Sequence, residues 1–447
     1  MLALLGAWLL VPGQALAKEV GSEQAVVHYQ LPNGLDVVLE RDARQPRVAV
    51  VVGYDVGWRD DPPGLDGLAH MVEHLSFRST RHLPKPFEAG QLLRRAGATD
   101  INGFTGPDDT SYQEVVPEGA LPLALFVESE RMAFSLERFS TKAIELEKNI
   151  IWREGALLHR SPEDQFNQDS VNAFFGMWHP YARGDDEAEQ LNYADLASAQ
   201  AFFQQTYRPD NAHLVLVGDF QLEPTRALIE QYFGSIVASA LPRRAAVNTT
   251  VTTHARSFVR RSLARLDELS VTWPAPDPRS DDGVASKLLA LQLLAKLQDA
   301  LVRDQKLASK VGVSLYPFEL GPMLQFSIAT EGDIDKVLPV FEAELGALWR
   351  TDWPRRLPPL RRQLVLSEQL RRASLIEVAR DHLESARSTH QPYDFRAHLT
   401  QLERVSPARM RALSQLYKAD QAMLGWLLRV GGTSARLAVT GIEVVPR

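Results

Sequence analysis

The sequence contains no cysteine among its 447 residues. This absence excludes disulfide bonds, a thiolate nucleophile, iron–sulfur clusters and zinc sites built on Cys ligands. A metal ion held by this chain must therefore be bound by His and carboxylate side chains. Positive charge is also scarce, because 49 Lys and Arg stand against 56 Asp and Glu and give a net charge of -7. A mildly acidic chain binds nucleic acid poorly, so we expect no nucleic-acid partner.

A long apolar run occurs only at the N-terminus. Leu2–Val11 is almost entirely apolar, and Ala15-Leu16-Ala17 after it resembles a signal-peptidase cleavage site. We therefore predict that residues 1–17 are an export signal and that the protein is periplasmic or otherwise exported. A retained membrane anchor or a frayed N-terminal helix is the alternative. Because no later stretch is long and apolar enough to cross a bilayer, we expect no membrane span once the signal is removed.

Strand and helix patterns alternate along the rest of the chain, which predicts an α+β fold. Asn33-Gly34 between two apolar stretches is a strong hairpin signal, and the β-branched run Val48–Tyr54 is typical of a buried strand. Further strands are expected at 111–116, 213–217, 269–273 and 325–329. Helices are expected at 67–78, 85–96, 120–136, 141–158, 284–303, 333–350 and 360–387.

A weak internal repeat divides the chain into two parts. Tyr207, Asp210, Ala212 and Leu214 each recur 210 positions later, as Tyr417, Asp420, Ala422 and Leu424. Residues 237–257 lose periodicity and collect small, polar and basic side chains, which indicates a linker. We therefore predict two similar α+β domains, 18–236 and 258–447, joined by the linker 237–257; coincidence between two helix–turn–strand units is the alternative.

One motif carries metal chemistry. His70, Glu73 and His74 form H-x-x-E-H, and positions i, i+3 and i+4 share one helix face. Two imidazoles at this spacing can bind one Zn²⁺, while the carboxylate between them reaches the same space. The motif is the inversion of H-E-x-x-H and is a signature of zinc peptidases.

A catalytic zinc needs a third protein ligand. The predicted helix 141–158 offers Glu147 and Glu154, which are seven residues apart and so share a face. These carboxylates are candidates for a metal ligand and for a supporting group next to it. The other interpretation is an ordinary solvated helix face, because Lys148 and Arg153 adjoin them.

Several segments together resemble the pitrilysin/insulinase family of zinc metallopeptidases, which includes the mitochondrial processing peptidases and exported bacterial relatives. They are GWRD at 57–60, GLAHMVEHLSFRST at 67–80, NGFT at 102–105 and YRPDN at 207–211. The resemblance covers nearly the whole mature chain. It implies two homologous α+β domains, each a mixed sheet flanked by helices, that face each other across a chamber. It also implies that Glu147 and Glu154 form the family's E-x6-E, with Glu154 as third zinc ligand and Glu147 as a supporting catalytic carboxylate.

The resemblance also implies a substrate-binding strand. Asn102, Gly103, Phe104 and Thr105 match the family's N-A-x-T segment, with Gly103 in place of Ala, and in relatives that segment pairs with substrate backbone. Active single-chain relatives carry an Arg and a Tyr in the second domain that contact the substrate. Here Arg303 fits the Arg, but Ser309 stands where Tyr is expected. We therefore expect a homologous partner chain to supply that pair in a heterodimer; a homodimer is the alternative assembly.

The sequence thus predicts a metalloendopeptidase with one Zn²⁺ per chain, held by His70, His74 and Glu154, with Glu73 as general base. Its substrates would be short or unfolded peptides. A processing protease with one defined precursor is a second possibility. A non-catalytic scaffold or chaperone-like subunit is the alternative from another class of protein.

Overall fold

The structure is a computed structural model that describes residues 26–78, 80–83, 89–137, 139, 141–158, 161–176, 179–182, 190–238 and 257–430, with the backbone alone at 154–158. The predicted export signal and nearly all of the predicted linker lie outside these residues.

Two sheets organise the molecule. The N-terminal sheet has the strand order β1-β2-β6-β3-β5-β4 and the C-terminal sheet has the order β7-β11-β8-β10-β9. In each sheet one neighbouring pair is parallel, β2 with β6 and β7 with β11, and the other pairs are antiparallel. The strands are β1 (Val26–Gln30), β2 (Asp36–Arg41), β3 (Arg47–Tyr54), β4 (Thr99–Thr105), β5 (Thr110–Pro117), β6 (Ala212–Gly218), β7 (Ser257–Ser262), β8 (Asp267–Pro274), β9 (Lys310–Tyr316), β10 (Met323–Thr330) and β11 (Met423–Arg429).

Without β1, the two sheets have equivalent strand orders, because β2-β6-β3-β5-β4 corresponds strand by strand to β7-β11-β8-β10-β9. The repeated Tyr residues occupy equivalent places, because Tyr207 and Tyr417 are both buried just before the parallel strands β6 and β11. This equivalence confirms the prediction of two similar α+β units.

Helices flank both sheets. In the N-terminal half they are α1 (Leu68–Leu75), α2 (Ala89–Arg95), α3 (Leu121–Phe134), α4 (Thr141–Leu158), α5 (Pro162–Phe175), α7 (Leu196–Thr206) and α8 (Leu222–Phe233). In the C-terminal half they are α9 (Asp281–Leu297), α10 (Val337–Ala347), α11 (Trp353–Arg371), α12 (Leu375–Thr389), α13 (Phe395–Arg404) and α14 (Pro407–Ser414).

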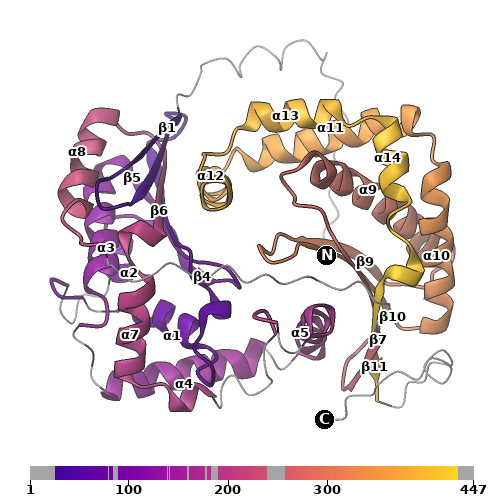
Figure 1. Cartoon of the computed structure of the whole chain (residues 1–447), viewed down its shortest axis with the longest axis horizontal. Coiled ribbons are helices and arrows are strands. Elements are labelled where there is room, and N and C mark those ends of the chain that lie inside the picture. The colour runs from indigo at the N-terminus through magenta and orange to yellow at the C-terminus, as the bar shows by residue number, and fades with distance from the viewer. Residues whose placement is uncertain are drawn as a thin grey trace.

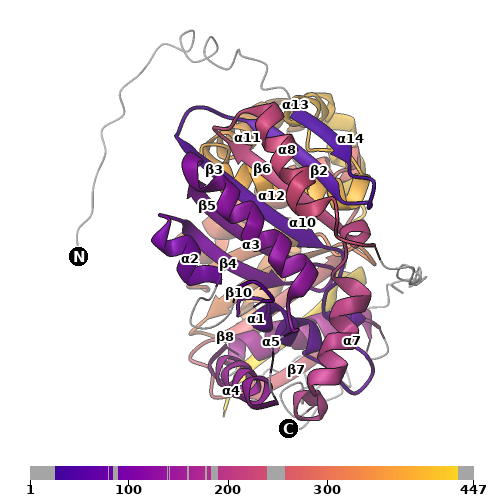
Figure 2. The same cartoon turned by 90° about the vertical axis from the view of Figure 1, so that its left-hand side faces the viewer.

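The N-terminal sheet is covered on both faces, and one cover comes from the other half of the chain. Alternate residues of β3, Val48, Val50 and Val52, pack with α1, α3, α7 and α8. The residues between them, Ala49 and Val51, pack against α12. Figure 1 shows α12 beside β6, on the opposite side of the sheet from α3 and α8, and Figure 2 shows α3 and α8 lying over the strands. This double burial explains why Val48–Tyr54 reads as a continuous apolar run.

The C-terminal sheet receives a helix in return. One face packs against α9, α10, α11 and α14. Its other face packs against α5, whose Phe166 contacts Phe258 of β7 with ring centroids 5.3 Å apart. Each half therefore completes the core of the other.

One predicted helix was wrong in extent. Residues 360–387 were expected to form a single helix, but the chain breaks after Arg371, and α12 begins at Leu375. Ser374 takes an extended conformation as the N-cap of α12, without a capping hydrogen bond from its side chain. The break redirects the chain from the C-terminal helical layer to the N-terminal sheet.

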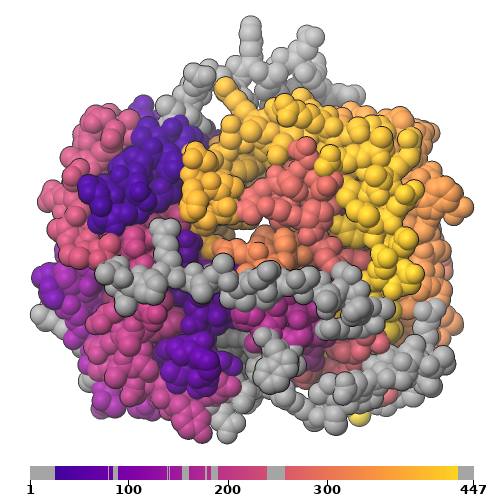
Figure 3. All heavy atoms as spheres, viewed as in Figure 1, coloured from indigo at the N-terminus to yellow at the C-terminus, as the bar shows by residue number. Residues whose placement is uncertain are grey.

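A cavity of about 780 Å³ lies where the N-terminal and C-terminal halves meet, a boundary called the seam below. Asp55 and His213 line it from the N-terminal half, and Glu319 and Arg387 line it from the C-terminal half. The space-filling view has a gap near its centre, bordered by yellow, salmon and orange atoms of the C-terminal half (Figure 3). Across the residues that the structure describes, no helix is both long and apolar enough to cross a membrane.

Candidate active site

The inverted motif lies on α1, a short helix whose start is fixed by a carboxylate. Asp61 accepts hydrogen bonds from the backbone N–H groups of Gly67 and Ala69, each at 2.7 Å. These donors have no partner within the helix, and a negative charge at this end is favoured by the helix dipole. The apolar face of α1 is buried through Met71 and Leu75. Both constraints hold the opposite face, which carries the motif, in one orientation.

His70 and His74 converge as the helical spacing predicts. Their Nε2 atoms lie 3.2 Å apart, with the ring planes at 83°. Two imidazole nitrogens bound to one tetrahedral zinc at about 2.0–2.1 Å would lie about 3.3 Å apart. The separation of the two nitrogens therefore matches that of two ligands on one zinc ion.

Glu73 is buried between α1 and the edge strand β4. Its Oε2 accepts a hydrogen bond from Thr105 Oγ1 at 2.9 Å. A Cβ added at Gly103 would lie 2.6 Å from Glu73 Oε1 and 2.8 Å from Cε2 of Phe77. The strand thus approaches the carboxylate so closely that only glycine fits at position 103 without displacing it.

Glu147 reaches the site from α4. It is only 3% exposed, its Oε1 lies 2.6 Å from Nη2 of Arg78, and its Oε2 lies 3.7 Å from Nδ1 of His74. Oε2 is buried and accepts no hydrogen bond within the described part of the chain. A His74 that binds metal through Nε2 carries its proton on Nδ1, so it would direct that proton toward this oxygen.

The third predicted ligand is placed by its backbone alone. Glu154 lies in α4 two turns beyond Glu147, and its side chain is outside the described part of the chain. Among the side chains that are described, no three His, Asp or Glu residues form a complete metal site.

The buried guanidinium of Arg131 contacts the C-terminal end of α1. Arg131 of α3 donates from Nε to the backbone oxygen of Ser76 at 3.3 Å and pairs with Glu128 at 2.6 Å. Its guanidinium also lies 4.2 Å from the ring centroid of Tyr112. Burial raises the pKa of Tyr112 well above its usual value, so this phenol stays neutral beside the cation.

The predicted substrate-binding residues separate into three places. Gly103 and Thr105 face α1, whereas Phe104 lies on the other face of β4, where Arg380 of α12 stacks 4.9 Å from its ring centroid. Asn102 is exposed, and its Oδ1 accepts a hydrogen bond from Gly103 N at 3.0 Å. β4 is an edge strand, paired on one side with β5.

Arg303 is not brought to this cluster by any described contact. It lies on the π-helical turn Gln298–Asp304 and pairs with Asp299 on the same turn, with 69% of its side chain exposed. Ser309, at the position where Tyr was expected, donates to the backbone oxygen of Ala329 at 3.1 Å.

Arg78 was missed by the sequence analysis. It stands four residues after His74, a helical interval that could have drawn attention to it, although α1 ends at Leu75 and position 78 lies in the turn beyond. Its contact with Glu147 makes it part of the candidate site.

The chain belongs to the insulinase family of peptidases, M16. The family model "Insulinase (Peptidase family M16)" matches residues 36–176, and "Peptidase M16 inactive domain" matches residues 193–355. The first match contains the inverted motif together with Glu147 and Glu154 of α4.

Curated relatives include an uncharacterized zinc protease of Mycobacterium tuberculosis, 29% identical over 206 residues. That match covers 46% of this chain and 46% of the relative, so the alignment spans about half the length of the relative. A relative described as a zinc protease supports a peptidase-like function.

Solved structures share the fold over most of the chain. A protease from Helicobacter pylori superposes with a TM-score of 0.81 at 22% identity, covering 90% of this chain and 99% of that one. The periplasmic protease PqqL from Escherichia coli superposes with a TM-score of 0.75 at 16% identity, covering 95% of this chain and 49% of that one. Both support the two-domain architecture.

Proposed function

We propose that this chain is a zinc-dependent endopeptidase that hydrolyses short or unfolded peptides. One Zn²⁺ per chain would be held by His70, His74 and Glu154. The observation that carries the proposal is the convergence of the two histidine Nε2 atoms, 3.2 Å apart, beside the buried carboxylate of Glu73.

Glu73 is the general base of the proposed reaction. Bound zinc would acidify a water molecule and polarise the peptide carbonyl. Glu73 takes the proton of the attacking water and returns it to the leaving amine. Thr105 holds one oxygen of Glu73, and Glu147 orients the ring of His74 while pairing with Arg78. The chain's own residues thereby hold the base and the ligand in place.

The edge strand β4 is the proposed substrate platform. It pairs on one side with β5, so an extended peptide can add to its other side through main-chain hydrogen bonds. Such bonds depend little on sequence, which favours unfolded peptides of varied composition. The chamber that the family resemblance implies would favour short chains over folded proteins.

A homologous sister chain, in a heterodimer, is proposed to supply the Arg–Tyr pair, because a second copy of this chain would carry the same Ser309. Support comes from Arg303, which is engaged with Asp299 on its own turn, and from Ser309 at the position of the expected Tyr. A missing donor to the developing oxyanion can cost about 10²–10³-fold in rate. Full activity of the purified monomer at nanomolar concentration would contradict this part of the proposal.

Export to the periplasm is also proposed. It rests on the signal-like residues 1–17 and on the Escherichia coli neighbour, which is described as a periplasmic protease. Fractionation of cells that produce the full chain tests this location.

The experiment that tests the catalytic proposal combines metal analysis with cleavage of a quenched peptide. Glu73→Gln should retain zinc and lose about 10²–10⁴-fold in kcat, because the base is removed while the ligands stay. Glu154→Gln should lower the zinc content, and a chelator should abolish cleavage by the wild type. Glu403→Gln, exposed on α13, is the matched control and should leave both readings unchanged. Unreduced cleavage by Glu73→Gln would show that the assigned base is wrong.

A non-catalytic scaffold is the second candidate, because the family model that matches residues 193–355 describes an inactive domain. This candidate predicts a chain that binds no zinc and cleaves no peptide, even with a homologous partner present.

A further inference from the structure

The turn between β4 and β5, Gly106–Asp109, is held from both halves of the molecule. Its Asp108 is 5% exposed and pairs with Arg59. Asp108 also accepts from Tyr181 Oη at 2.7 Å and from the backbone N–H of Glu319 at 3.1 Å. Glu319 belongs to the C-terminal half, between β9 and β10, so this carboxylate joins segments distant in the sequence.

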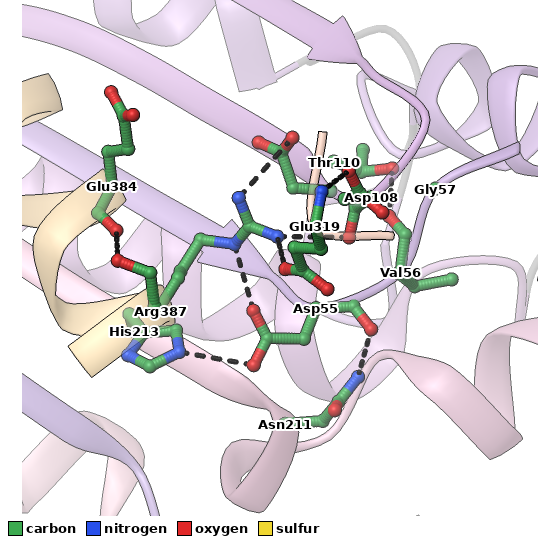
Figure 4. A network of polar contacts seen from close by, with 12 residues as sticks. Asp55, Val56, Gly57, Asp108, Thr110, Asn211, His213, Glu319, Glu384 and Arg387 are labelled. Carbon is green, nitrogen blue, oxygen red and sulfur yellow. Dashed lines mark hydrogen bonds and ion pairs between the residues drawn. The ribbon is translucent and has the colours of Figure 1, made fainter. Parts of the chain in front are cut away.

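Arg387 of α12 completes the contacts of the turn. Its Nε donates to Asp55 Oδ1 at 2.8 Å, and its Nη2 donates to the backbone oxygen of Asp108 at 3.0 Å and to Glu319 Oε1 at 3.1 Å. Its Nη1 lies 3.4 Å from Asp109 Oδ1. Figure 4 shows the guanidinium of Arg387 reaching from α12 into this group of carboxylates. All three nitrogens of one side chain are engaged, which the planar fork of Arg permits and a Lys ammonium does not.

Three carboxylates surround this guanidinium. Burial lowers the pKa of Arg387, but the charges of Asp109, Asp55 and Glu319 outweigh burial and hold that pKa above its ordinary value. Only 10% of the side chain is exposed. Removal of the cation would take from Asp109 its described ion pair, whereas Asp55 would keep His213 and Glu319 would keep Arg59.

The turn is also coupled to the segment that leads into α1. Trp58 N donates to the backbone oxygen of Gly106 at 3.0 Å, and Arg59 N donates to that of Pro107 at 3.3 Å. A Cβ at Gly57 would lie 2.3 Å from the Gly106 oxygen, so the two backbones are in direct contact. Thr105, the residue before the turn, donates to Glu73. A shift of the turn therefore moves the edge strand relative to Glu73.

We infer that Arg387 is a positioning residue for the peptidase site: from the C-terminal half, it fixes the β4–β5 turn and thereby the place of the edge strand beside Glu73. The inference rests on the proposed function, because it concerns the same site. It gives the C-terminal half a role in hydrolysis although the motif residues all lie in the N-terminal half.

A matched control exists at the same seam. Arg372, in the break between α11 and α12, pairs with Glu40 of β2 at 3.1 Å, and 19% of its side chain is exposed. This pair also joins the two halves through a buried carboxylate, but its described contacts do not include the turn. Arg372→Gln therefore shows how far the loss of one ion pair between the halves, away from the β4–β5 turn, changes exchange and activity.

The experiment compares Arg387→Gln, Arg387→Lys and Arg372→Gln in the full zinc-loaded protein. Hydrogen exchange is measured across Thr99–Thr105, and kcat and KM are measured with a quenched peptide. Arg387→Gln should raise exchange across β4 by about tenfold, since local protection follows local stability. It should lower kcat/KM by about 10–100-fold, as expected for a misplaced strand and base. Arg387→Lys should recover part of both, and Arg372→Gln should change neither.

Two outcomes would overturn the inference. One is wild-type exchange across β4 in Arg387→Gln; the other is an equal effect from Arg372→Gln, which would make Arg387 an ordinary seam contact. If Arg387→Gln does not fold, Arg387→Lys carries the same comparison. If the wild type holds zinc but cleaves no peptide, the proposed function fails, while exchange across β4 still decides whether Arg387 positions the strand.

Discussion

Position 103 sets how closely the edge strand β4 can approach helix α1. The backbone of Gly103 faces the Glu73 carboxylate and the Phe77 ring, and no space remains for a methyl group. The carboxylate can move because it ends a flexible side chain, whereas the ring packs against Tyr112 with centroids 5.6 Å apart. A side chain at 103 would therefore displace the carboxylate first.

We predict that Gly103→Ala lowers kcat by about tenfold or more and also lowers the melting temperature, because the added Cβ would lie 2.8 Å from Cε2 of Phe77. The physical reason for the lower kcat is that the carboxylate of Glu73 moves away from Thr105. Peptide cleavage and thermal unfolding are the measurements. Gly119→Ala is the control, since its added Cβ meets no atom within 4 Å. Unchanged kcat in Gly103→Ala would show that the carboxylate tolerates the methyl group.

The motif could be predicted at the residue scale because it is local. His70, Glu73 and His74 lie within five residues, and helical spacing alone brings them together. Glu147 needed the family resemblance, since only the fold places α4 beside α1. The contact of Arg387 with Asp108 spans 279 positions, and no pattern in the sequence relates two residues that far apart.

At the scale of elements, α12 is the cover of a sheet in the other half. Its buried residues Leu375, Val378 and Leu383 lie against the strands β3 and β6. Leu383 packs directly over Gly53, where a Cβ would lie 2.5 Å from a methyl carbon of Leu383. The fit depends on a small residue on the strand and a large one on the helix.

We predict that Leu383→Ala lowers the free energy of unfolding by about 2–5 kcal/mol, because Gly53 offers no side chain to fill the cavity left behind. Denaturant unfolding measures the change. Leu370→Ala, at a position of α11 that is 68% exposed, should stay within about 0.5 kcal/mol of the wild type. Similar losses from the two variants would mean that α12 does not pack as described.

The pattern of α12 was recognised in the sequence but its place was not. Apolar residues at helical spacing predicted a helix through 387, and periodicity indicates that a face is buried without naming what buries it. The break at Arg372–Ser374 was missed because these residues are compatible with a helix, and the chain turns there to reach a distant sheet. The run Val48–Tyr54 was correctly predicted as a buried strand, because its apolar composition shows that both faces are covered. The composition does not show that the helix covering one face is α12.

At the scale of the whole molecule, a chain of polar contacts crosses the seam. His28 of β1 and His213 of β6 both contact Asp36, and His213 also contacts Asp55, which pairs with Arg387 of α12. Burial lowers the pKa of His213, but the hydrogen bonds to Asp36 and Asp55 outweigh burial and raise that pKa to about 8. The seam therefore depends on a buried imidazolium.

The pH dependence of unfolding follows from this shift. A histidine whose pKa is higher when folded stabilises fully below its unfolded value of about 6.5, and the contribution is lost as pH rises through the folded value of about 8. We predict that the wild type loses about 2 kcal/mol of unfolding free energy relative to His213→Gln between pH 6.5 and 9. Denaturant unfolding across that range is the measurement. His390→Gln, exposed at the end of α12, should follow the wild type, and parallel curves for wild type and His213→Gln would contradict the prediction.

Each sheet is covered by a helix from the other half, α12 on the N-terminal sheet and α5 on the C-terminal sheet, and this arrangement affects the nascent chain. α12 ends 171 residues after β6 (389 − 218), so the N-terminal strands leave the ribosome long before the helix that covers them. At a synthesis rate of about 5–20 residues per second, the apolar face formed by Val38, Val51 and Val215 waits about 10–30 s for its cover. During that interval the nascent chain exposes an apolar sheet face that a chaperone can bind. The core of the N-terminal half can be completed only when the C-terminal half has been synthesised.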